Sequence, residues 1–348
     1  MRNALVALVL AVAAASPAAA KTSATILVDG NALDAGTLAG VQLVAVEQQA
    51  NAPSACTIEI GVSKQASPDS PFVPGQTLEV REPSGATLFK GEIIGIEPTF
   101  ASRGAGKLVI RGFDKMYPLT RTRRTKTWLD KTDSEIVQRV ADDAGLTASV
   151  KDVPIRHDHV YQHNQTDLEF IRARAARIGF EIRVDDGTLF FAPAPPLDGA
   201  VERSVTLVNP RVFSAGAAPS RVEVRGWNPV TKTPIVGQAG GGGAGAAYVE
   251  DHADASSEDP LQSDYLFFSQ ADADAVATAA LRERILASQT AEGDTEGDPA
   301  LHVGMTVQLE AGARFNGKYL VTGCTHKFTS KGGGGYRTFV KLKRNAEG

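Results

Sequence analysis

The sequence predicts a mainly β protein in which a segment containing helices separates two similar small β-barrels. Three observations support this fold class. Short runs that alternate apolar with polar residues, such as residues 56–62, are punctuated by turn residues. Two capping-box sequences predict helices in the middle of the chain. The first and last β regions also share an ordered set of short matches, which indicates an internal repeat.

The composition is that of a folded protein with room for several domains. The chain has 348 residues, of which 43% are hydrophobic and 22% charged, so a disordered chain, a collagen or a coiled-coil rod is excluded. A net charge of −4 gives no general case for nucleic-acid binding. Cys56 and Cys324 are too few for a disulfide scaffold, and whether they pair stays open.

Residues 1–20 resemble a secretory signal peptide. Arg2 supplies the positive end, an apolar run follows, and the small triplet Ala18-Ala19-Ala20 precedes Lys21. The apolar run is about a dozen residues and is shorter than the roughly 20 that a membrane-spanning helix requires. We expect export of the mature chain from this pattern, and no stable insertion in a membrane.

Residues 23–112 are expected to form the first barrel. Leu78 and Val80 alternate with Glu79 and Arg81, as in half-buried strands. The turns that separate such runs are predicted at four places: Asp29-Gly30, Pro74-Gly75, Pro83-Ser84-Gly85 and Arg103-Gly104.

Residues 113–196 are expected to form an α+β insertion. Thr132 with Glu135, and Thr166 with Glu169, make two capping boxes that each precede a helical apolar pattern. Gly145 and Gly179 are expected to end the two helices. A hairpin that turns at Asp185-Asp186-Gly187 and a proline-rich stretch at 193–196 close the segment.

Residues 197–348 are expected to form the second barrel, with a glycine-rich surface loop at 240–245 and one helix over about 271–288. Its repeat relationship to the first barrel rests on three matches in the same order. Residues 75–77 (Gly-Gln-Thr) match 304–306 (Gly-Met-Thr), 89–93 (Phe-Lys-Gly-Glu-Ile) match 315–319 (Phe-Asn-Gly-Lys-Tyr), and 102–104 (Ser-Arg-Gly) match 330–332 (Ser-Lys-Gly). Two barrels per chain give six in a homotrimer, which suits a junction between threefold and sixfold assemblies.

No constellation of catalytic residues stands out, and we expect neither an enzyme nor a cofactor. The sequence contains no Gly-x-Ser-x-Gly elbow, no His-Glu-x-x-His helix and no phosphate-binding loop. His157, His159 and His163 are the one histidine cluster, but they have no defined carboxylate or thiolate partner, so no metal site is predicted.

Charge is distributed unevenly along the chain. Residues 101–131 contain nine basic and two acidic side chains, whereas residues 250–298 contain thirteen acidic and two basic ones. The two stretches are candidates for attraction across a subunit interface, and two solvated faces are the alternative. The candidate interface residues in the basic stretch are Arg121, Arg123, Arg124, Lys126 and Trp128. This run lacks the interleaved aromatic residues typical of nucleic-acid binding, so no nucleic-acid partner is expected.

The middle of the chain resembles a known family through several motifs. They are Arg111-Gly112-Phe113-Asp114-Lys115, residues 123–128 (Arg-Arg-Thr-Lys-Thr-Trp), residues 161–170 (Tyr-Gln-His-Asn-Gln-Thr-Asp-Leu-Glu-Phe) and Gly317-Lys318-Tyr319-Leu320-Val321. Over residues 23–345 the chain resembles the tail-hub family. That family comprises phage late control protein D and the hub portion of the valine-glycine repeat spike proteins of type VI secretion and contractile injection systems.

The resemblance implies a trimeric, non-catalytic symmetry adaptor between a hexameric tail tube and a trimeric spike. The expected partners are therefore further copies of the chain, a tail tube protein and a spike protein. The sequence ends without a needle-like region, so the spike is expected to be a separate chain. Such hubs assemble in the cytoplasm as part of a tail or injection particle, which conflicts with the leader at 1–20. A secreted or periplasmic binding protein built on the hub fold, and an exported hydrolase, are the alternatives.

Overall fold

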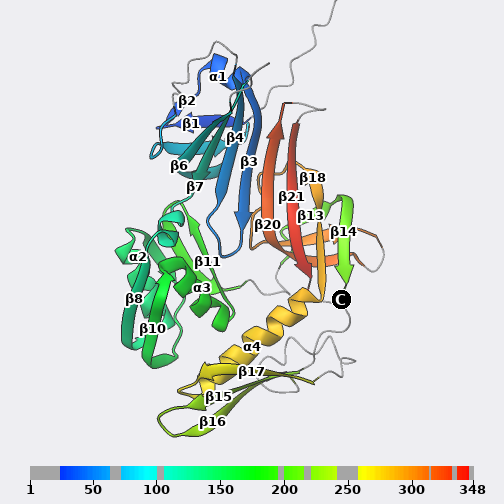
Figure 1. The fold of residues 1–348 in the computed structure, drawn as a ribbon. Helices are drawn as coiled ribbons and strands as arrows, with labels where there is room; N and C mark the ends of the chain where they lie inside the picture. The colour runs from blue at the N-terminus through cyan, green and yellow to red at the C-terminus, as the bar shows by residue number, and fades with distance from the viewer. Residues whose placement is uncertain are drawn as a thin grey trace, which may run out of the picture.

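The computed structural model has four structural units, and it confirms the mainly β fold class (Figure 1). Two of the units are β units that share one large, mostly antiparallel sheet. It describes residues 24–62, 72–99, 106–194, 200–214, 221–240, 258–312, 315–330 and 335–344. The predicted leader, the turn at Arg103-Gly104 and most of the glycine-rich loop lie outside the described residues. Gly240, the first residue of that loop, ends a strand.

The first β unit comprises residues 24–113, and Phe328 from the C-terminal part of the chain completes its apolar core. Asp29 and Gly30 both have positive φ, so the predicted turn between its first two strands is confirmed. The elements of this unit are β1 (Thr25–Val28), β2 (Asn31–Ala32), α1 (Ala35–Ala39), β3 (Val41–Gln49), β4 (Ala55–Val62), β5 (Thr77–Arg81), β6 (Thr87–Thr99) and β7 (Gly106–Phe113).

The second β unit buries a separate core and joins the first within the same sheet. Its elements are β13 (Arg203–Thr206), β14 (Val208–Ser214), β18 (Gln289–Glu296), β19 (Thr306–Glu310), β20 (Gly317–Thr329) and β21 (Gly335–Arg344). The neighbour order β14-β18-β21-β20-β19 repeats the order β3-β4-β7-β6-β5 of the first unit. The two units therefore share the order of five strands, although the next strand is antiparallel in the first unit and parallel in the second.

The register of the ladders shows the equivalence at single-residue level. In the first unit a row of directly opposed residues crosses five strands: Glu47, Ala55, Phe113, Glu92 and Thr77. In the second unit the corresponding row is Phe213, Thr290, Lys343, Leu320 and Thr306. The long strands are also interrupted alike, because the register shifts between Ile93 and Gly95 in β6 and between Val321 and Gly323 in β20.

One of the three predicted sequence matches is out of register by two residues. The Gly-x-Thr match is confirmed, since Thr77 and Thr306 end equivalent rows. The match of Gly91 with Gly317 is wrong, because Gly91 lies opposite Leu78 whereas the equivalent position opposite Val307 is held by Tyr319. A shift of two residues keeps each side chain on the same face of its strand, so the alternation pattern alone does not reveal it.

The middle unit carries both predicted capping boxes. The side chains of Thr132 and Thr166 accept hydrogen bonds from the amides of Glu135 and Glu169, and each glutamate returns the bond to the threonine amide. The elements of this unit are η1 (Tyr117–Thr120), β8 (Arg123–Thr132), α2 (Asp133–Asp143), β9 (Thr147–Val150), β10 (Arg156–Thr166), α3 (Asp167–Arg177), β11 (Phe180–Asp185) and β12 (Thr188–Pro193). Gly145 and Gly179 follow the helices with positive φ, as predicted.

A fourth unit interrupts the second β unit. Its elements are β15 (Arg221–Asn228), β16 (Thr233–Gly240), β17 (Glu258–Leu266) and α4 (Gln270–Ala287). The helix begins and ends within one residue of its predicted limits and packs on the three-stranded sheet, with a separate apolar core between them. The sequence analysis did not predict that this three-stranded sheet stands apart from the second β unit.

Candidate functional site

The two β units meet along one strand pair, which we call the join. The outer half of β20 pairs antiparallel with β3, from Gly323 opposite Gln49 to Thr329 opposite Leu43. The inner half of β20 pairs with β19, so the strand passes from its own unit to the edge of the first unit (Figure 1). Strand edges are sites where sheets associate, and here one chain uses this property to connect its two halves.

A buried polar network lies at the join. The ring of His326 is 1% exposed; its Nδ1 atom is 2.7 Å from the hydroxyl of Tyr336 and its Nε2 atom 3.1 Å from the carbonyl of Leu301. Because the carbonyl only accepts, Nε2 carries the proton and Nδ1 accepts from the tyrosine. Burial lowers the pKa of His326 to about 4, in spite of the opposing bond to Leu301.

Cys324 lies beside this histidine but is not arranged as a nucleophile. Its Sγ atom is 3.4 Å from Nε2 of His326. Burial raises the pKa of the Cys324 thiol to about 12, so the thiolate needed for attack is not available near neutral pH. Cys56 and Cys324 are both free thiols and belong to the cores of different units, which answers whether they pair.

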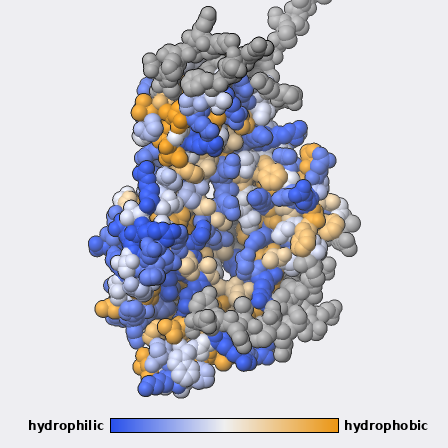
Figure 2. Space-filling model, in the orientation of Figure 1, coloured by the Kyte–Doolittle hydropathy of each residue, from blue (hydrophilic) through white to orange (hydrophobic). Residues whose placement is uncertain are grey.

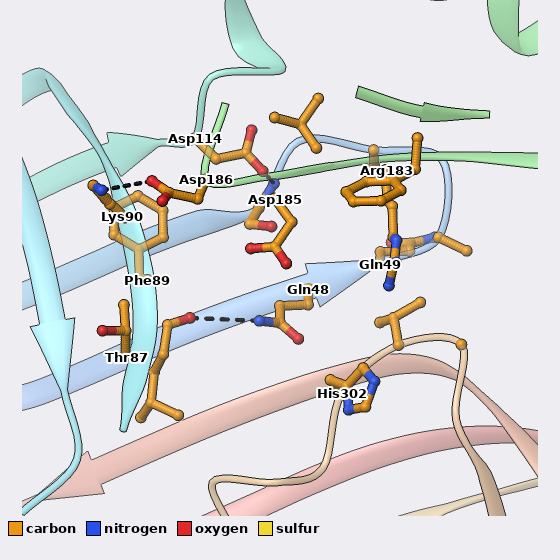
Figure 3. Close-up of a pocket in the computed structure, with 18 of the residues that line it drawn as sticks. Gln48, Gln49, Thr87, Phe89, Lys90, Asp114, Arg183, Asp185, Asp186 and His302 are labelled. Atoms are coloured by element: carbon orange, nitrogen blue, oxygen red, sulfur yellow. Dashed lines mark hydrogen bonds and ion pairs between the residues drawn. The ribbon is translucent and has the colours of Figure 1, made fainter. Parts of the chain in front are cut away.

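A cavity of about 760 Å³ lies where the two β units and the middle unit meet (Figure 3). Lys90 of β6 reaches Asp186 in the β11–β12 turn, with Nζ and Oδ1 2.5 Å apart. Asp114 accepts from the amides of Ser54 and Met116, and burial raises its pKa in spite of these bonds. These polar groups connect segments from different units, so the cavity is a junction within the chain.

The candidate interface residues of the basic stretch lie in β8 and in the turn before it. Arg123 pairs with Glu169 at 3.1 Å, and Arg124 with Asp167 at 2.9 Å. Arg121 lies over the ring of Tyr117, 5.3 Å from its centroid. The surface over α2 and β8 is mostly hydrophilic (Figure 2). Among the described residues, no ion pair connects stretch 101–131 with stretch 250–298.

Lys126 and Trp128 lie on the face of β8 that packs toward the core of the middle unit. Lys126 is 3.5 Å from Asp143 and lies 4.0 Å from the centroid of the Trp128 ring. Trp128 itself is 7% exposed and stacks on Phe170, with ring centroids 6.3 Å apart. Trp128 therefore packs in the core of the middle unit, because alternate residues of β8 face the helices, and its place at an interface stays a prediction.

The histidine cluster is divided between core and surface. His157 is buried beside Arg174, which contacts its Nε2 atom at 2.7 Å, and Arg174 in turn pairs with Asp133 at 2.5 Å. His159 and His163 flank the exposed ring of Tyr161 on β10. Within the described ranges, no group of three or more ligating side chains could hold a metal ion.

The middle and fourth units are fixed to one another by a buried ion pair. Arg177 ends α3, and its guanidinium contacts both carboxylate oxygens of Asp272 in the first turn of α4; its Nε atom lies 3.2 Å from Oδ1. Both side chains are almost inaccessible to solvent. Sequence analysis did not identify this pair, the join or the cavity, since each combines residues far apart in the chain. The one available indication of the join was the internal repeat.

Solved structures share this fold over nearly the whole chain. A 43 kDa tail protein of prophage MuSo2 from Shewanella oneidensis has a TM-score of 0.70 at 14% identity, covering 93% of this chain and 98% of that one. A tail protein from Neisseria meningitidis has a TM-score of 0.69 at 12% identity, with 93% and 96% covered. An Escherichia coli protein described as a type VI secretion component similar to T4 tail proteins gp27 and gp5 has a TM-score of 0.58 at 16% identity, with 88% and 74% covered.

The fold is therefore that of phage tail proteins and the related hubs of type VI secretion, as the sequence resemblance implied. A family model described as the Alg8 N-terminal domain matches residues 18–330, and the chain belongs to that family. The family description names a domain and no activity. No curated protein matches the sequence. Among the described residues, no helix combines the length and apolar character needed to cross a bilayer.

Proposed function

We propose that the protein is a structural baseplate hub. In this role it forms a homotrimer that connects a hexameric tail tube on one face with a trimeric spike, a separate chain, on the other. The observation that carries the proposal is the matching pair of five-residue rows, which gives each chain two equivalent β units. Three copies then supply six equivalent units to a tube and three identical faces to a spike.

The proposed role is mechanical and involves no catalysis. The Cys–His pair at the join is buried, and in the cavity Lys90 and Asp186 form an ion pair that connects two units. Assembly inside the producing cell, as part of a tail or injection particle, follows from this role. Four cations of the basic stretch, Arg121, Arg123, Arg124 and Lys126, are proposed as docking residues for an acidic surface of another subunit.

The role is tested by reconstitution from purified components. The full chain is mixed with candidate tube and spike proteins from the same organism, and complexes are separated by size and imaged. We expect a particle in which three copies of this chain separate a six-subunit tube ring from one spike trimer. Binding to neither component at micromolar concentrations would contradict the proposal.

The leader pattern favours one second candidate, a secreted or periplasmic binding protein on the same fold. The two functions differ in where the chain resides and whether residues 1–20 are removed. N-terminal sequencing of the protein from its native host distinguishes them. A mature chain that begins at Lys21 outside the cytoplasm, without tube or spike, would support the binding protein.

A further inference from the structure

Exposed apolar side chains gather at one end of the fourth unit. Val230 lies in the turn between β15 and β16 and is 70% exposed, and Trp227 and Leu266 are 47% and 55% exposed. Pro234 is exposed as well. We call these four residues the tip patch. Figure 1 shows the β15–β16 hairpin at the opposite end of the molecule from α1, so the tip patch lies at one extremity of the chain.

The pairing of the strands places three of these side chains in one row. Trp227 lies directly opposite Pro234 of β16 and opposite Leu266 of β17. Directly opposed residues point to the same face of a sheet. Val222 and Val224 of β15 point to the other face, where they share an apolar core with α4. The row is therefore on the face of the sheet that is turned away from the helix.

The turn that carries Val230 is held by its own hydrogen bonds. The buried side chain of Asn228 accepts from the amides of Val230 and Thr231 at 2.9 and 3.1 Å. The hydroxyl groups of Thr231 and Thr233 are 2.7 Å apart. Hydrogen bonds from an asparagine side chain to the backbone two and three residues on fix a turn locally. Contact through Val230 therefore requires little further ordering of the chain.

Positive charge accompanies the apolar tip. The β15–β16 hairpin carries three cations, Arg221, Arg225 and Lys232, and one anion, Glu223. Arg225 shares a face with Trp227 and is about 7 Å farther from the turn along the strand. Although Arg225 pairs with Glu223, its side chain is 61% exposed. An apolar end followed by cations matches the layers of a membrane surface, where acyl chains lie beneath anionic headgroups.

We propose that the tip patch binds peripherally to a bilayer surface that contains anionic phospholipid. Its aliphatic members enter the boundary between headgroups and acyl chains, and Trp227, with an apolar ring and a polar N–H group, lies at that boundary. Arg225 and Lys232 meet the headgroup phosphates. The binding is reversible and differs from stable insertion, because even a whole acyl chain gives only marginal attachment. This contact goes beyond the hub function and does not depend on it, since one chain suffices.

Tryptophan emission tests the contact directly. The full chain is mixed with vesicles at millimolar lipid, made of neutral phospholipid alone or with about 30% anionic phospholipid. The sequence has two tryptophans, of which Trp128 is buried in the middle unit, so a change on adding lipid reports Trp227. We expect emission to shift to shorter wavelength and brominated acyl chains to quench it. The partition coefficient should be about tenfold higher for the anionic vesicles. Residues 1–20 contain no tryptophan, so their own contact with lipid does not produce this signal.

A double variant with a matched control identifies the patch. Val230→Ser with Leu266→Ser keeps Trp227 as the reporter and should lower the partition coefficient by about tenfold or more, since both changes remove apolar surface from the contact. Phe213→Ser removes a ring that is 61% exposed on β14, far along the chain from the tip, and should change lipid binding little. Circular dichroism checks that each variant keeps its fold.

A charge variant tests the preference for anionic lipid. Arg225→Ser with Lys232→Ser should remove most of the difference between anionic and neutral vesicles, because two of the three cations of the hairpin are lost. Glu223→Gln removes the one anion and should increase that difference. A preference that both variants leave unchanged would contradict the role given to the cations.

The outcomes separate this inference from the hub function. Unchanged Trp227 emission with anionic vesicles would overturn the inference, as would equal binding by the unmodified chain and the Val230, Leu266 double variant. If that variant loses association with tube or spike while the unmodified chain does not bind vesicles, the tip patch is a protein contact and the lipid inference is wrong. Vesicle binding is measured on this chain alone, so each of these failures leaves the hub function to its own reconstitution test.

Discussion

Thr77 and Thr306 hold the same place in the two β units, each at the end of a row of five directly opposed residues. The two β units agree in strand order, in register and in the position of the β-bulge, which lies in β6 of the first unit and in β20 of the second. The sequences of β6 and β20 nevertheless differ. The chain therefore carries two copies of one sheet-forming design. The hub account depends on this relationship, since it makes three chains equivalent to six positions.

Acid should destabilise the join through His326. Its pKa is about 4 in the folded state and about 6.5 when unfolded, so the unfolded chain takes up the proton first as pH falls. Stability from the neutral ring is present above pH 6.5 and is lost between about pH 6.5 and 4, by roughly 3 kcal/mol. Denaturant unfolding at pH 7 and pH 4.5 measures it. His326→Gln should show a smaller loss over this interval, and an equal loss would contradict the assignment.

Two glycines of β6 should respond differently to alanine. A Cβ atom at Gly91 would collide with the carbonyl group of Phe113, whereas one at Gly95 would meet nothing within 4 Å. We expect Gly91→Ala to lower the free energy of unfolding by about 1–3 kcal/mol and Gly95→Ala to change it little in the monomer. Thermal and denaturant unfolding compare the variants. Equal effects would mean that the strand adjusts at both positions.

The buried pair of Arg177 and Asp272 should be strongly coupled. Asp272→Ala leaves a buried guanidinium without its carboxylate, which typically costs about 3–5 kcal/mol of stability. Arg177→Ala should also destabilise, and the double variant should lose less than the sum of the two. A double-mutant cycle in urea should give a coupling of about 1–3 kcal/mol. Additive losses would show that the two side chains act independently.

Reversal of the basic stretch should weaken assembly without unfolding the chain. Arg123 and Arg124 are exposed, and their ion pairs to α3 contribute little to folding stability. Replacing Arg121, Arg123 and Arg124 by glutamate should therefore lower the free energy of unfolding by only about 1–3 kcal/mol in total. Association with tube or spike, followed by sedimentation, should fall more at 50 mM than at 300 mM salt. Arg139→Glu, at another exposed ion-paired arginine, is the control. Unchanged assembly would identify the stretch as a solvated face.

The sequence predicted local structure well. It did not predict the interactions between segments that are far apart in the chain. The capping boxes at Thr132 and Thr166 and the cap of α4 at Ser269 each operate within four residues, so the sequence alone places them. The Lys90–Asp186 pair instead spans 96 positions, and alternation does not reveal which strands meet. The burial of Trp128 was not predicted for the same reason, since it depends on Phe170, a partner on α3.

The mass of the full chain in solution, measured by light scattering over a range of concentrations, tests the central claim most directly. For the protein alone the account predicts the mass of three 36.6 kDa chains, and once the spike protein is added it predicts three such chains plus one spike trimer. A stable dimer or tetramer, or a monomer that persists at high concentration with the spike present, would contradict it.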